Sequence, residues 1–302
     1  MRLIIPVESF VQNLGGVIMY DPINNKILKQ YVHDKKWKRV GWRGGKVFGN
    51  HLIATDWQDL HYFNIKTWKY EKTFQKKTFN DLHYVEVING KLYVVNTGLD
   101  AIEIFNKPMN PQFESLIFLY KKNNKIFKQR SLNKNSIYND KLKVKPHSAH
   151  PNCIAANKGK ILVNCFGKEQ RNHTGEVIDF DTGKRVLKKN FDCHDGIFYN
   201  GDYYLTRTRY ATILKIKNLA NRSYPVAKAD QVFRIGKKGW WRGMVIHDDV
   251  AYVFASDGYR RKKTTAKMAT VNLKTGEKRS RKLPSIDGVH WETIYQPNIY
   301  EE

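Results

Sequence analysis

One hairpin pattern, repeated along the chain, constrains the fold more than any other feature of the sequence. Its clearest copy spans residues 81–100, where two β-rich segments flank Asn89-Gly90. Asn-Gly favours the two-residue hairpin turns that need positive φ angles, so the segment predicts two antiparallel strands in a fixed register. The pattern recurs at residues 41–59, 150–168, 193–210 and 241–259. Such repetition predicts a fold built from copies of one supersecondary unit.

Each copy is followed by a second, less distinct hairpin, which brings the unit to about four antiparallel strands. Two of these outer hairpins turn at Asp181-Thr182-Gly183 and at Lys274-Thr275-Gly276. Successive first strands are 40, 67, 44 and 48 residues apart, counted from residues 43, 83, 150, 194 and 242. Tandem four-stranded units of this length are typical of a β-propeller, where radial repetition leaves few exposed sheet edges. The sequence therefore predicts an all-β chain.

The two ends of the chain fit together as one more unit. Residues 288–295 resemble another first strand, whereas residues 3–9 and 15–32 begin partway through a unit. We therefore expect the C-terminal strand to complete the N-terminal blade and close a ring of six blades. The whole of residues 1–302 forms a single domain in this interpretation. The Lys- and Asn-rich segment 107–149 is an insertion or an elaborated outer hairpin, and a seventh blade within it is the alternative.

Basic residues at the start of the first strands form the candidate functional site. First strands line the central channel of a propeller, so we expect their starting ends to meet at one mouth of it. The six positions are Arg43, His83, His150, His194, Arg242 and His290. In strict register, Asn152 replaces His150 in the third unit. Converging basic groups are costly to desolvate unless an anion or a metal lies among them, although bracing between blades is an alternative role for each.

Two chemistries fit this set, and the sequence leaves both open. In the first, a divalent transition metal is the cofactor, since neutral imidazole is a common ligand of such ions. Its ligands would be His83, His150, His194 and His290.

In the second chemistry, Arg43 and Arg242 hold a sulfate, phosphate or carboxylate group. His194 then acts as general base or nucleophile, with help from Asp195 and a contribution from His83. Cations beside a divalent metal are unfavourable, so the arginines favour this second chemistry. Further side chains expected to contact the substrate are Asp56, Asn96, Asn152, Tyr199 and Arg207.

At the level of its repeats, the whole chain resembles the superfamily of six-bladed propellers. Its members include arylsulfotransferase-like enzymes, lactonase-type metal hydrolases and several polysaccharide lyases. The site residues are most similar to the sulfate-handling sites of arylsulfotransferase-like propellers, where histidine and arginine face the transferred group. The residues that carry this resemblance are Arg43, His83, Asn152, His194 and Arg242. The resemblance implies that they face an anionic group.

Composition adds a class of partner and a compartment. The formal net charge of +25 attracts polyanions such as nucleic acid or acidic polysaccharide, although lysines spread over a solvated surface also explain it. Three cysteines give no disulfide framework and indicate a reducing compartment, so we expect a cytoplasmic protein or a virion component. No apolar run is long enough to span a membrane.

Two functions remain open from the sequence. The first is an enzyme, of the transferase, lyase or hydrolase type, that acts on an anionic small molecule or acidic sugar at the channel. The second is a non-catalytic platform, such as a scaffold, a virion component or a lectin-like module, that binds a polyanionic or protein partner.

Overall fold

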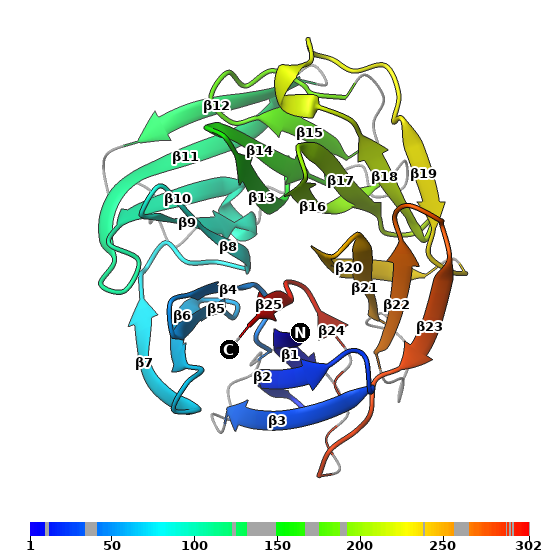
Figure 1. Cartoon of the computed structure of the whole chain (residues 1–302). Coiled ribbons are helices and arrows are strands. Elements are labelled where there is room, and N and C mark those ends of the chain that lie inside the picture. The colour runs from blue at the N-terminus through cyan, green and yellow to red at the C-terminus, as the bar shows by residue number, and fades with distance from the viewer. Residues whose placement is uncertain are drawn as a thin grey trace.

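Six antiparallel sheets formed by the described residues surround a central axis in the computed structural model of the chain (Figure 1). The structure describes residues 1–9, 12–33, 41–122, 125–131, 149–166, 175–187, 192–237, 239–256, 266–287, 289, 291 and 293–301. This six-bladed propeller confirms the predicted fold class and blade number. Within these residues, no helix is long and apolar enough to cross a membrane.

Blades 2 to 6 run from the channel outward in sequence order. Blade 2 contains β4 (Gly45–Phe48), β5 (His51–Thr55), β6 (Asp59–Asn64) and β7 (Lys69–Gln75). Blade 3 contains β8 (Leu82–Ile88), β9 (Lys91–Asn96), β10 (Ala101–Asn106), β11 (Gln112–Lys122) and β12 (Lys125–Ser131). Blade 4 contains β13 (Pro151–Asn157), β14 (Lys160–Cys165) and β15 (Glu176–Asp179). Blade 5 contains β16 (Cys193–Tyr199), β17 (Asp202–Arg207), β18 (Thr212–Ile216) and β19 (Gln231–Arg234). Blade 6 contains β20 (Trp240–His247), β21 (Val250–Ser256), β22 (Lys267–Asn272) and β23 (Lys278–Lys282).

Blade 1 joins the two ends of the chain. It contains β1 (Arg2–Ser9), β2 (Leu14–Asp21) and β3 (Lys26–His33), with β24 (Thr293–Ile294) and β25 (Asn298–Tyr300) both paired to β1. The predicted closure of the ring by the C-terminal segment is therefore confirmed. The closing strand is split, however, and the intervening Tyr295, Gln296 and Pro297 reach across the channel.

The tight turns predicted for the inner hairpins are present. Asn89 and Gly90 have φ angles of 50° and 73°. Asn200 and Gly201 repeat this geometry in blade 5, with φ angles of 48° and 81°. Two consecutive positive φ angles match the twist of the flanking strands and fix their register.

Apolar side chains fill the space between neighbouring blades. Val95 of blade 3 and Val163 of blade 4 belong to one buried cluster, and Trp42 and Trp291 are among the largest fully buried side chains. In the Lys- and Asn-rich segment 107–149, β11 and β12 form an outer hairpin of blade 3. The residues from 132 to 148 lie outside the described part of the chain.

Candidate functional site

β-Bulges at the start of the inner strands turn the candidate side chains toward the channel. The ladder shifts at the start of β8, β13 and β16, and between Arg242 and Met244 within β20. The residues at the first three shifts are His83, Asn152 and the pair His194 and Asp195. A bulge leaves a residue outside the ladder and re-aims its side chain. We call the end of the channel that these residues face the axial mouth.

Tyr295 lies at the centre of the axial mouth. Its ring centroid is 3.9 Å from the guanidinium carbon of Arg242 and 5.7 Å from that of Arg43. The imidazole centroids of His83 and His194 are each 5.8 Å from it. The structure therefore brings these four predicted residues together, around a tyrosine that the repeat pattern did not single out. Pro297 was the available signal, because proline interrupts a strand and here accompanies the split that turns Tyr295 inward.

Arg43 is held by carboxylates of the protein itself. Its Nη1 donates to Asp81 Oδ1 at 2.6 Å, and its Nε lies 3.7 Å from Glu8 Oε2. Its guanidinium also stacks 3.8 Å from the ring of Trp57. Burial alone would lower the pKa of Arg43, but the carboxylates of Glu8 and Asp81 raise this pKa above its ordinary value. The contacts join blades 1, 2 and 3, so an incoming anion would have to compete for Arg43 with two buried carboxylates.

His83 is buried between two polar partners. Its Nδ1 is 3.2 Å from Asn152 Oδ1, and its Nε2 is 3.5 Å from Asp81 Oδ1. Burial lowers the pKa of His83 to about 4, and the charges of Arg43 and His194 act in the same direction. The imidazole is therefore neutral at neutral pH. A neutral imidazole can accept a proton directly, whereas an imidazolium must lose one first.

His194 forms an oriented pair with Asp195. His194 Nδ1 is 3.1 Å from Asp195 Oδ1, while Oδ2 accepts from Thr206 Oγ1 at 3.0 Å and from the Gly243 amide at 2.9 Å. Three donors thus fix a carboxylate that is 2% exposed. A carboxylate on Nδ1 favours the tautomer whose Nε2 carries the lone pair. No described side chain hydrogen-bonds to Nε2, so this nitrogen is available as a base.

The phenol of Tyr295 is protonated at neutral pH. Burial raises its pKa above the ordinary value, although Arg242 and Arg43 oppose the shift. Within the described residues its hydroxyl has no hydrogen-bond partner. Arg242 itself is half-buried, in contrast to the buried Arg43, and its guanidinium lies over the Tyr295 ring.

The other predicted substrate contacts divide into near and distant residues. Asn152 holds His83, and Arg207 lies opposite Cys193 in the ladder, with its guanidinium 4.0 Å from the ring of Tyr210. Asn96 is fully buried within blade 3, where it donates to Thr78 and Glu103.

Tyr199 ends β16 at the other end of the channel. Its hydroxyl accepts from the Asp249 amide at 3.0 Å. It lines a cavity of about 620 Å³ that Gln296 and Pro297 border. The axial mouth and this second opening are therefore different sites.

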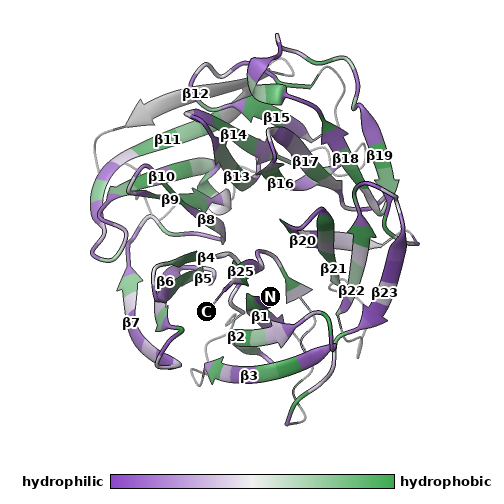
Figure 2. Cartoon of the chain, in the orientation of Figure 1, coloured by the Kyte–Doolittle hydropathy of each residue, from purple (hydrophilic) through white to green (hydrophobic). Residues whose placement is uncertain are grey.

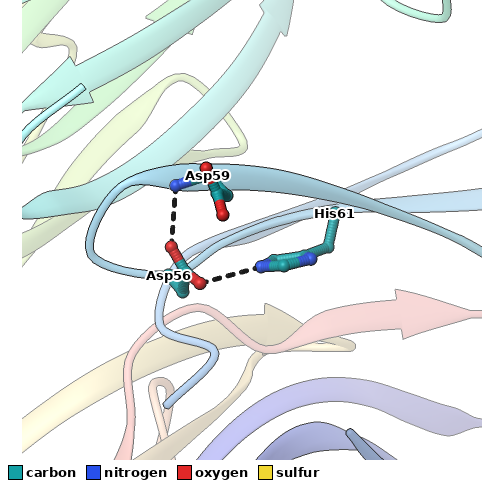
Figure 3. Close-up of side chains that lie close together, drawn as sticks. All are labelled: Asp56, Asp59 and His61. Carbon is teal, nitrogen blue, oxygen red and sulfur yellow. Dashed lines mark hydrogen bonds and ion pairs between the residues drawn. The ribbon is translucent and has the colours of Figure 1, made fainter. Parts of the chain in front are cut away.

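Asp56 belongs to a turn between β5 and β6 (Figure 3). Its Oδ1 accepts from the Asp59 amide at 2.7 Å, and its Oδ2 lies 3.0 Å from His61 Nε2. His61 is 2% exposed and stacks on Trp42, with 4.9 Å between the ring centroids. Its position next to an aromatic-rich core explains this burial, and Asp56 is occupied by its own turn.

Three of the four histidines predicted to bind a metal lie within the described residues. His83 and His150 meet edge to face at 5.6 Å between centroids, and the His83 and His194 centroids are 6.3 Å apart. His290 lies outside the described residues. Within them, Asp56, Asp59 and His61 are the one set of three His, Cys, Asp or Glu side chains whose ligand atoms all lie within 4.8 Å of one another. The turn hydrogen bonds account for that set without an ion.

Buried carboxylates change the charge balance expected from the sequence. The basic residues were expected to need an external anion or a metal, but Glu8, Asp81 and Asp195 lie among them and are each at most 4% exposed. The sequence shows these acids, but not that the bulged strands bring them beside the basic side chains. The axial mouth is therefore a mixed network of acids and bases.

Comparisons with known proteins show the fold alone. No protein-family model matches the chain, and no curated protein matches its sequence. Among solved structures, a protein of unknown function from Bacteroides caccae matches with a TM-score of 0.58 and 13% sequence identity, over 90% of each chain. At this identity the match extends to the architecture and not to the residues of the axial mouth. The chain is thus a six-bladed β-propeller with no assigned family.

Proposed function

We propose that this propeller is an enzyme that acts on an anionic small molecule or acidic sugar at the axial mouth. The observation that carries the proposal is the His194–Asp195 pair, in which a buried carboxylate with three donors orients an imidazole toward the channel. A histidine with a purely structural role does not need a carboxylate that fixes the direction of its other ring nitrogen. Orienting pairs of this kind support general acid–base and nucleophilic catalysis.

The surrounding residues supply the other parts of an acid–base reaction. Nε2 of His194 removes a proton from the substrate or from water, and Asp195 stabilises the imidazolium that forms. Arg242 binds the anionic group of the substrate, because it is the more accessible of the two arginines. Tyr295, whose burial keeps it protonated, returns a proton to the leaving group. Hydrolysis, elimination and group transfer all fit this arrangement.

Substitution of His194 and Arg242 tests the proposal. We expect His194→Gln to lower kcat/KM by about 100-fold or more, as for other general bases, and Arg242→Gln to raise KM for anionic substrates. Assays would use 4-nitrophenyl sulfate, 4-nitrophenyl phosphate and acidic oligosaccharides. Both variants should keep the melting temperature of the wild type. Unfolding of both variants, or unchanged turnover in both, would show that these residues are braces.

Arg43→Gln is the matched comparison for Arg242→Gln. It leaves Glu8 and Asp81 as buried, partly unpaired carboxylates, so we expect it to reduce the free energy of unfolding by about 3 kcal/mol. This loss should appear even without a substrate. It separates an arginine that braces blades from one that binds an anion.

A non-catalytic platform is the second candidate function. The observation that favours it is that Glu8, Arg43 and Asp81 link blades 1, 2 and 3, which supports a structural role for part of the basic ring. Such a platform would retain its binding partner in the His194→Gln and Arg242→Gln variants. A pull-down with these variants distinguishes the two functions.

A further inference from the structure

Cationic side chains concentrate on the outer edge of blade 6, away from the axial mouth. Four of the five residues of β23 are basic, namely Lys278, Arg279, Arg281 and Lys282. The strand is hydrophilic along its length at the rim of the propeller (Figure 2). Arg279 pairs with Glu277, and Arg281 donates to the carbonyls of Pro22 and Ile23. The arginines are thus partly satisfied, whereas Lys278 and Lys282 form no ion pair with any residue that the structure describes.

Two lysines face each other across the β22–β23 ladder. Lys267 pairs directly with Lys282, and like charges in directly opposite positions destabilise a sheet. No carboxylate in the described part of the chain forms an ion pair with Lys237, Lys267, Lys278 or Lys282. An unfavourable and uncompensated arrangement of this kind favours an anionic ligand between the lysines.

A cleft of about 540 Å³ is lined by three of these four lysines, and Lys282 lies opposite one of them, Lys267, in the ladder. We call it the blade 6 cleft; its lining includes Lys237, Trp240, Trp241, Lys267, Lys278 and Ser280. Trp241 is fixed, because its Nε1 donates to the Lys237 carbonyl at 3.0 Å. Trp240 is 37% exposed, with the guanidinium of Arg209 4.9 Å from its ring. The cleft therefore combines a rigid aromatic wall with a hydroxyl and four cationic side chains, since Arg279 also lines it.

We propose that the blade 6 cleft binds an acidic oligosaccharide that carries sulfate or carboxylate groups. The lysines would pair with the anionic groups, and the exposed face of Trp240 would pack on the apolar face of a sugar ring. A single-stranded nucleic acid is less suited to this cleft. Such ligands are bound along extended grooves by a series of stacking aromatic residues, and here one exposed tryptophan stands beside a compact cleft.

The position of Trp240 favours an oligomer over a single sugar. Trp240 and Arg242 are two residues apart in β20, or about 7 Å along a strand. One oligosaccharide can therefore reach from the blade 6 cleft to the axial mouth. The cleft is nonetheless composed of residues outside the axial mouth, so its ligand binding does not depend on catalysis there.

Calorimetric titration of the full chain tests this site. The probes are a heparin-derived hexasaccharide, a hexagalacturonate, neutral maltohexaose and a thymidine oligonucleotide of matched charge. The test variants are Lys267→Gln/Lys282→Gln and, separately, Trp240→Ala. The control is Lys66→Gln/Lys69→Gln, which removes the same charge from exposed positions of blade 2. The Lys267→Gln/Lys282→Gln variant should fold at least as stably as the wild type, because it relieves a repulsion.

We expect at least one acidic hexasaccharide to bind the wild type and the control with the same Kd. Binding should weaken about tenfold in each test variant, and maltohexaose should not bind. Equal weakening in the control would show diffuse charge attraction only and overturn the site. Tighter, Trp240-dependent binding of the oligonucleotide would overturn the carbohydrate assignment. Because these measurements detect binding and not turnover, they hold whether or not His194 proves to be catalytic.

Discussion

Burial separates residues of the axial mouth that looked equivalent in the sequence. Arg43 and Arg242 occupy the same repeat position, but the first is buried between Glu8 and Asp81 and the second is half-buried over Tyr295. His83 and His194 differ in the same way, since His83 has polar partners on both ring nitrogens. Residue type and repeat position therefore predicted where these side chains meet, and the partners of each decide what it can do.

His83 gives the protein a defined sensitivity to acid. Its pKa is about 4 in the folded chain, below the value of about 6.5 expected in the unfolded chain, so the unfolded state binds the proton more readily. The stabilisation that comes from the neutral form of His83 is fully present above pH 6.5 and is lost as the pH falls from 6.5 to 4. We expect protonation of His83 to lower the free energy of unfolding by on the order of 3 kcal/mol over that range. Urea unfolding of the wild type and of His83→Gln, followed across pH 4 to 8, measures it.

The difference between the two proteins isolates His83. Charged and titratable groups that face it come from several blades: Arg43, Asp81, His150, His194 and Tyr295. These groups are present in both proteins, so their contribution largely cancels. Parallel pH profiles for the wild type and His83→Gln would mean that His83 is not held neutral by burial.

Elements were predictable where the local sequence dictates backbone geometry. Asn89-Gly90 predicted its turn correctly, because these residues readily adopt the positive φ angles that the turn requires. The repeat likewise predicted the six blades correctly. The bulges at His83, Asn152 and His194 were not predictable, because a bulge depends on how neighbouring blades pack and not on a residue preference. The same limit applies to Asp56 and His61, whose pairing requires the fold of a complete hairpin.

Gly44 sets the distance between blades 2 and 3. A Cβ on this residue would lie 2.6 Å from both the His83 carbonyl oxygen and the Tyr84 Cα, and backbone atoms cannot move aside as a flexible side chain can. We expect Gly44→Ala to lower the free energy of unfolding by about 2 kcal/mol or more, as overpacked sites do. The change would also displace His83, so the acid sensitivity described above should change with it. Chemical denaturation at pH 8 and at pH 5 measures both effects.

Gly90→Ala is the matched control for this substitution. A Cβ on Gly90 would meet no heavy atom within 4 Å, but the φ angle of 73° at this position disfavours alanine. The expected cost is about 1 kcal/mol, from backbone strain alone and without any change in pH dependence. Equal effects of the two substitutions would contradict the close approach of the blades at Gly44.

At the scale of the whole molecule, the C-terminal segment both closes the ring and organises the channel. β24 and β25 complete blade 1, and the residues between them place Tyr295 in the axial mouth and Gln296 beside the second opening. The sequence predicted the closure but treated the closing strand as continuous. Pro297 was a local signal for the split, but the backbone groups of Gly45 and Val85 that Gln296 bonds come together only in the assembled ring, so the path of the segment was not predicted.

Gln296 joins three blades through those edges. Its side-chain oxygen accepts from the Gly45 amide at 2.8 Å and from the Val85 amide at 3.3 Å, and its amide group donates to the Val85 carbonyl at 2.7 Å. Gln296→Ala leaves these buried backbone groups without partners, at a cost of about 1 to 3 kcal/mol for each well-formed bond. We therefore expect a loss of about 3 kcal/mol in urea unfolding, against almost none for Gln58→Ala on an exposed turn. Because Tyr295 precedes Gln296, the same variant should lose activity or ligand binding at the axial mouth. If Gln296→Ala unfolds at the same urea concentration as Gln58→Ala, the ring is closed by β24 and β25 alone.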